Sequence, residues 1–157
     1  MDGTDPEGAN LYRTDLYATI AFTIAAVLAA IFPDPLDIPF AVFSTILFGI
    51  GTIAFLWAYA KAIERSREHD VSVAMIYGMS GVAPKEIRRK FHLLTFVQSA
   101  VAITTAAIRP FSPQAFGILV PMLGIGLAGL WAARHGTFTE RTDGRYKARE
   151  MNRTKNG

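Results

Sequence analysis

The stretch from residue 39 to residue 62, PFAVFSTILFGIGTIAFLWAYAKA, decides the fold class of this chain. It runs for 24 residues, and Lys61 is its only charged residue. About 20 helical residues, rising roughly 1.5 Å each, cross the hydrocarbon core of a bilayer. A surface helix of a soluble domain would show a polar stripe, and this stretch has none. It therefore predicts a transmembrane helix.

Three further apolar stretches, residues 16–32, 91–108 and 114–133, have the same character. The four stretches make up about half of the 157 residues, and every charged residue except Lys61 lies outside them. This separation explains how a chain that is 51% hydrophobic can have a pI near 9.4. It predicts an all-α polytopic membrane protein with four transmembrane helices, and it excludes a soluble enzyme and a nucleic-acid-binding module. Helical signals extend the third span, so we expect it to run unbroken from about Pro84 to about Arg109.

The polar segments predict the organisation and the orientation of the chain. We expect an acidic N-terminal tail at 1–15, a four-helix transmembrane domain at 16–133 with a loop at 63–90, and a basic tail at 134–157. The loop together with Lys61 holds seven Lys and Arg residues, and the basic tail holds another seven. Cytoplasmic segments of membrane proteins are enriched in Lys and Arg. Both termini and the loop are therefore predicted to be cytoplasmic.

A repeated pattern suggests that the four spans form two tandem hairpins. Residues 29–33 read Ala-Ala-Ile-Phe-Pro, and residues 106–110 read Ala-Ala-Ile-Arg-Pro. A further proline, Pro39 or Pro113, is expected at the start of each returning helix, where its missing N–H costs nothing. A tryptophan follows each of these prolines after 18 residues, Trp57 after Pro39 and Trp131 after Pro113. Both tryptophans are expected in an aromatic belt at the inner membrane interface.

Polar and small side chains within the spans predict contacts between helices. Thr95, Gln98 and Ser99 form a polar stripe on the third span. An unpaired amide in hydrocarbon costs several kcal/mol, so Gln98 has to face a neighbour, as an interhelical contact or as a contact to a solute. Gly124 and Ala128 give the fourth span a small-residue face that suits close packing against a helix, including one from a partner protein or a second copy.

The chemistry of catalysis is missing from the sequence. It contains no sequence motif of a metalloprotease, a serine hydrolase or a phosphate-binding loop, so we expect no catalytic residue, no cofactor and no enzymatic activity. The three histidines, His69, His92 and His135, lack local metal-ligand spacing, so no metal site is expected. Proton- and cation-coupled carriers usually keep an ionisable group at midmembrane depth, and none is expected at that depth in the predicted spans.

The basic clusters next to the spans predict contact with the bilayer surface. A juxtamembrane Lys or Arg attracts anionic lipid by about 1 kcal/mol. The residues expected to contact lipid headgroups are Lys85, Arg88, Arg89, Lys90, Arg145, Lys147 and Arg149. Residues 71–81 in the loop are apolar but too short to cross, and Gly78 and Gly81 break them. This segment is expected either to lie on the membrane or to dock under the bundle.

Four stretches of the chain carry a resemblance to a known group of proteins. They are Ser80-Gly81-Val82-Ala83-Pro84, Arg109-Pro110-Phe111, residues 116–122 (FGILVPM) and Ala133-Arg134-His135-Gly136. Across residues 40–140 the chain resembles uncharacterised small four-helix integral membrane proteins of actinobacteria. The resemblance implies a multi-pass protein of the plasma membrane, and it brings no catalytic residues with it.

These observations favour a non-enzymatic integral membrane protein. The leading hypothesis is a scaffold or accessory subunit that contacts anionic lipid or a membrane partner. The alternative is a permease for a small solute, with Thr95, Gln98 and Ser99 lining its path.

Overall fold

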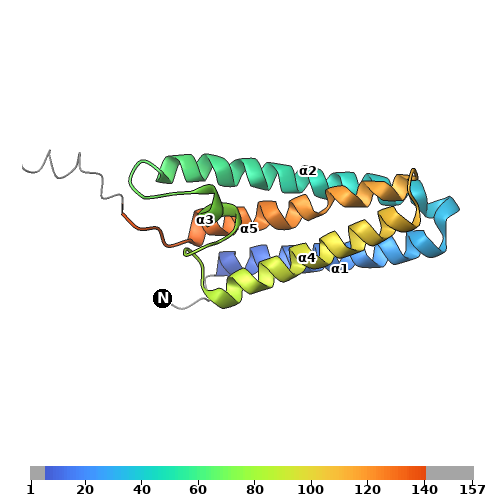
Figure 1. Ribbon diagram of the computed structural model, residues 1–157, viewed down its shortest axis with the longest axis horizontal. Helices are drawn as coiled ribbons and strands as arrows, with labels where there is room; N and C mark the ends of the chain where they lie inside the picture. Colours follow the sequence, from blue (N-terminus) through green and yellow to red (C-terminus); the bar gives the residue numbers. More distant parts are fainter. Residues whose placement is uncertain (1–5, 141–157) are drawn as a thin grey trace, which may run out of the picture.

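The computed structural model describes residues 6–140 and contains four long helical segments that lie side by side (Figure 1). They are α1 (Pro6–Ile31), α2 (Pro33–Arg65), α4 (Lys85–Ile108), and a 3₁₀ helix η1 (Pro113–Leu119) followed by α5 (Pro121–His135). A short helix, α3 (Val73–Tyr77), lies between α2 and α4. All four segments are long and apolar enough to cross a membrane. The prediction of an all-α, four-helix, multi-pass membrane protein is confirmed, and α4 is unbroken as expected.

Helix α1 begins earlier than the sequence predicts. It starts at Pro6, whereas residues 1–15 were expected to form an acidic tail, of which residues 1–5 lie outside the described part. The buried positions of α1 continue at helical spacing toward its N-terminus: Gly8, Asp15, Thr19, Phe22, Ala26 and Ala29. The sequence did not predict these buried positions before residue 16, because a charged residue such as Asp15 normally marks the end of an apolar span. The packed face of α1 therefore extends beyond the apolar stretch that begins at Leu16.

The prolines lie at different places in the two hairpin turns. Helix α2 starts at Pro33, with only Phe32 between it and α1, so Pro39 lies inside α2. The expectation that Pro39 begins the returning helix is wrong. Pro33 begins the helix instead, at a position where the backbone N–H would have no partner within the helix, so a proline is tolerated there. The second turn follows the prediction, since Pro113 begins η1 behind Ser112, whose hydroxyl accepts a hydrogen bond from the Gln114 N–H. The fourth span changes from 3₁₀ to α geometry at Pro121.

Helix α5 is the central helix of the bundle. Of its apolar stretch, 61% is buried inside the protein, against 28% in each of the other three spans. Helix α2 makes its most extensive contact with α5, and helix α1 makes its most extensive contact with α4. Each helix of the first hairpin therefore packs mainly against a helix of the second hairpin. Gly124 and Ala128 are both buried. Of the contacts that this small-residue face suits, the structure shows packing inside the bundle, where Thr95 and Gln98 of α4 lie next to Gly124.

The two tryptophans that looked equivalent in the sequence have different environments. Trp57 is 52% exposed, as an interfacial residue would be, but Trp131 is only 7% exposed. The Trp131 ring lies against α1, where a Cβ added at Gly8 would meet its Nε1 at 2.8 Å. Trp131 is therefore a core residue, and its assignment to an interfacial belt is wrong.

The apolar segment 71–81 docks under the bundle. The ring of Tyr77 stacks on that of Phe55 with 4.2 Å between centroids, and its hydroxyl donates to the Phe55 carbonyl at 3.1 Å. Ile76 and Met79 are buried. Of the two places expected for this segment, the structure selects the docked one.

Replacing Tyr77 with alanine should release this segment from the bundle. The change removes a stacked ring and a hydrogen bond, which together contribute about 2 kcal/mol, so local opening should become roughly 30-fold more frequent. Hydrogen exchange of the backbone amides of residues 71–82 measures this directly. Val73→Ala is the matched control, because Val73 is 71% exposed. Equal exchange in the two variants would show that Tyr77 does not anchor the segment.

Candidate functional site

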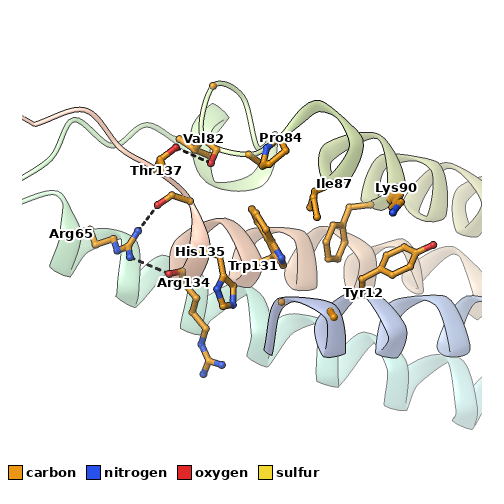
Figure 2. Close-up of a pocket in the computed structure, with 16 residues that line it drawn as sticks. Tyr12, Arg65, Val82, Pro84, Ile87, Lys90, Trp131, Arg134, His135 and Thr137 are labelled. Atoms are coloured by element: carbon orange, nitrogen blue, oxygen red, sulfur yellow. Dashed lines mark hydrogen bonds between the residues drawn. The ribbon is translucent and has the colours of Figure 1, made fainter. Parts of the chain in front are cut away.

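A cavity opens at the end of the bundle where α1 and α4 begin and α5 ends. It has a volume of about 690 Å³. Figure 2 shows Tyr12, Ile87 and Trp131 forming apolar walls, with the Lys90 side chain beside Tyr12. The polar side chains among the lining residues include Arg65, Lys90, Arg134 and His135, and the lining that the structure describes contains no Asp or Glu. The cavity therefore combines aromatic walls with cationic groups.

Arg65 has a structural role at this site. Its guanidinium donates to the Gly136 carbonyl at 2.9 Å and to the Arg134 carbonyl at 3.1 Å (Figure 2). It also lies 5.3 Å from the centroid of the Phe138 ring. These contacts join the end of α2 to the end of α5 and satisfy carbonyls that the helix end leaves without partners. Two of its five N–H donors are therefore used to fix the end of α5.

Lys90 and Arg134 remain available to a ligand. The Lys90 ammonium lies 5.7 Å from the centroid of the Tyr12 ring, and the Arg134 guanidinium lies 5.8 Å from that of Trp57. Both residues are exposed, and neither forms an ion pair within residues 6–140. A cation–π contact holds a cation over a ring face and leaves N–H donors free on its outer side. Each side chain can therefore bind an anion at its own place, since the Arg134 guanidinium points away from Lys90 in Figure 2.

The four predicted lipid-contacting residues of α4 are not equivalent. Lys85 and Arg89 are exposed, Arg88 is half-buried, and Lys90 is the one that lines the cavity. Sequence reasoning did not include Arg134, because its partner Trp57 comes from a helix distant in the chain. The other three predicted contacts lie outside the described residues: Arg145, Lys147 and Arg149.

A buried polar cluster lies beside the cavity. The Gln98 side-chain amide donates to Asp15 Oδ1 at 2.8 Å and to Thr19 Oγ1 at 2.7 Å. Asp15 lies directly before the apolar stretch 16–32, on the buried face of α1. An ionisable side chain is therefore enclosed in the bundle at the edge of the predicted first span. Sequence reasoning missed Asp15 because it placed this residue in a solvated tail.

The polar stripe of α4 divides into two kinds of residue. Gln98 is the interhelical contact, fully buried against α1. Thr95 and Ser99 are half-buried, and their hydroxyls donate to carbonyls of their own helix, those of Phe91 and Thr95. None of the three lines the cavity. The stripe therefore serves packing and internal hydrogen bonding in this structure.

A second amide–carboxylate pair lies at the opposite end of the bundle. Gln114 is buried, and its amide donates to the Ala29 carbonyl at 2.8 Å and to Asp37 Oδ1 at 2.7 Å. This pair joins η1 to the turn between α1 and α2. In both pairs, a glutamine of the second hairpin donates to an aspartate of the first.

The three histidines occupy separate places. A ring nitrogen of His92 lies 3.2 Å from the Gly78 carbonyl, His135 packs against the Trp131 ring, and the backbone of His69 bridges to Glu140. Over residues 6–140, no three His, Asp or Glu side chains are grouped so that they could hold a metal ion.

Comparisons of the chain with known protein families, with curated proteins and with solved structures find no match. The resemblance to actinobacterial membrane proteins gains no support from them, so the function has to be inferred from the geometry of the site.

Proposed function

We propose that this multi-pass membrane protein is non-enzymatic and holds the headgroup of an anionic lipid in the cavity between α1, α4 and α5. In this role it is a scaffold or accessory subunit of the plasma membrane. One observation carries the proposal: among residues 8–140, whose side chains the structure describes, the cavity lining has no Asp or Glu, and neither Lys90 nor Arg134 has an acidic partner. The excess of Lys and Arg at this end supports a cytoplasmic orientation.

The position and the walls of the cavity favour a lipid over a free anion. The cavity lies at the ends of the spans, which is the depth of the headgroups. Its apolar walls include Tyr12, Ile87 and Trp131. A phosphate at Lys90, beside Tyr12, would leave the glycerol and acyl portions of a lipid against these side chains, whereas a free anion would leave them in water.

The same geometry gives less support to a small-solute permease. That alternative needs Gln98 to face a solute path. The amide N–H groups of Gln98 are already used by Asp15 and Thr19, and its side chain is fully buried.

Replacing both Lys90 and Arg134 with alanine should weaken the binding of phosphatidylglycerol roughly 30-fold, because each lost cation contributes about 1 kcal/mol. The measurement is native mass spectrometry of protein released from nanodiscs that contain phosphatidylglycerol in phosphatidylcholine. The wild type should retain phosphatidylglycerol, and the double variant should lose it.

The control is the double variant Lys85→Ala/Arg89→Ala, which removes two exposed cations from the same helix end but none from the cavity. It should show a clearly smaller loss. Equal losses in both variants would mean that the basic surface attracts lipid without a site. Protein extracted from its own host in nanodiscs tests the accessory role, since a stoichiometric second polypeptide would support it and a pure monomer would count against it.

A further inference from the structure

The cluster of Asp15, Thr19 and Gln98 contains a carboxylate that no other part of the site accounts for. Asp15 and Gln98 have no exposed surface, and Thr19 is 3% exposed. The cluster connects α1 to α4 inside the bundle, where all three side chains are buried. The proposed lipid site does not use it.

The hydrogen-bond directions in the cluster determine which atoms remain free. The Thr19 hydroxyl donates to the Asp15 backbone carbonyl at 2.7 Å, so its oxygen can only accept from Gln98. The amide nitrogen of Gln98 therefore faces α1, and its oxygen faces α5, where a Cβ added at Gly124 would lie 2.9 Å from it. Asp15 Oδ1 accepts one bond, and Asp15 Oδ2 has no hydrogen-bonding partner in the described chain.

The titratable groups around Asp15 do not compensate a charge on it. On α1 the neighbour is Tyr12, on α4 it is Lys90 over the Tyr12 ring, and on α5 it is His135 against Trp131. The inward-facing charged residue of α2 at this end is Arg65, which donates to carbonyls, and η1 contains no titratable residue. A charged carboxylate surrounded by apolar side chains has to be paired or neutralised. Asp15 therefore needs a proton or a cation.

We propose that Asp15 is a proton-binding site, with the proton on Oδ2 and with Gln98 and Thr19 holding the carboxyl group in place. A metal cation fits poorly, because Asp15 Oδ1 and Thr19 Oγ1 both accept from N–H groups of Gln98, which would point at the cation. The proton exchanges with water through the cavity, whose lining includes Tyr12, three residues before Asp15 in α1.

Infrared spectroscopy of the full chain in lipid nanodiscs tests this proposal. A protonated carboxyl group in an apolar site gives a carbonyl stretching band that a carboxylate lacks. In the wild type at neutral pH this band should be present, should shift when aspartate is labelled with ¹³C at its carboxyl carbon, and should shift in D₂O. The band should be lost completely in Asp15→Asn, which keeps the acceptor for Gln98. It should persist in the matched control Asp37→Asn, which alters the other glutamine-bonded carboxylate.

Several results would overturn the proposal. Absence of the band in the wild type, or its survival in Asp15→Asn, would show that Asp15 does not hold the proton. A band that emerges only after Na⁺ is replaced by a bulky organic cation would assign the site to Na⁺ instead. A band without a shift in D₂O would contradict exchange through the cavity. If Asp15→Asn does not fold, the ¹³C label in the wild type still decides the question, because a band that the label leaves unshifted does not come from an aspartate.

Discussion

Alanine in place of Gly51 should lower the free energy of unfolding by about 3 kcal/mol. A Cβ at this position would lie 2.5 Å from the Leu123 nitrogen and 2.6 Å from the Leu123 Cα. These are backbone atoms of the central helix, so they cannot rotate away as a side chain would. Helices α2 and α5 would have to separate along their most extensive contact.

Gly49 provides a control from the same helix, two residues earlier. A Cβ added there meets nothing within 4 Å. Gly49→Ala should therefore be neutral or stabilise the protein by up to about 1 kcal/mol through helix propensity. Unfolding of both variants in mixed micelles, followed by circular dichroism, gives the two free energies. If Gly51→Ala proved as stable as Gly49→Ala, the close approach of α2 to α5 would be refuted.

Leucine in place of Gln98 should destabilise the protein by about 3 kcal/mol, because it leaves the Asp15 carboxyl group buried without its hydrogen-bond donor. The double variant Asp15→Leu/Gln98→Leu should recover much of this loss. Replacing both members of a buried polar pair by apolar residues removes the unpaired group along with the hydrogen bond. The sign of this recovery distinguishes a paired cluster from two independent polar residues.

Ser99→Ala is the control for the Gln98 series, since the Ser99 hydroxyl donates only to the Thr95 carbonyl of its own helix. It should change stability by less than about 0.5 kcal/mol. The same unfolding measurement serves all four proteins. Additive losses in the double variant would argue against the Asp15–Gln98 contact.

The limits of a span could be predicted from the sequence where the apolar residues and the flanking prolines are sufficient to define them. Helix α4 matches the predicted limits within a residue at each end, because Pro84 and Pro110 punctuate it. The interhelical role of Gln98 also followed from its depth, although its partner did not. Nothing in the sequence pairs position 98 with position 15, which are brought together only when α1 packs against α4.

The predictions were wrong where residues of similar character lie in different environments. Trp57 and Trp131 stand at equivalent positions of a repeat, yet one is exposed and the other faces the core. Asp15 is an ionisable residue like its neighbour Arg13, but only Asp15 lies on the buried face of α1. Hydropathy assigns each residue its average behaviour, and these side chains depart from that average because of what packs against them.

By itself, the sequence determined that this chain has four membrane-crossing helices, because the thickness of the hydrocarbon core sets the length of the apolar stretches that must cross it. Only the tertiary structure decided that α5 lies at the centre, that Asp15 is buried against Gln98, and that Lys90 and Arg134 share a cavity. The physical reason is that hydropathy reports transfer from water to lipid, whereas packing in lipid depends on shape and on hydrogen bonds between helices.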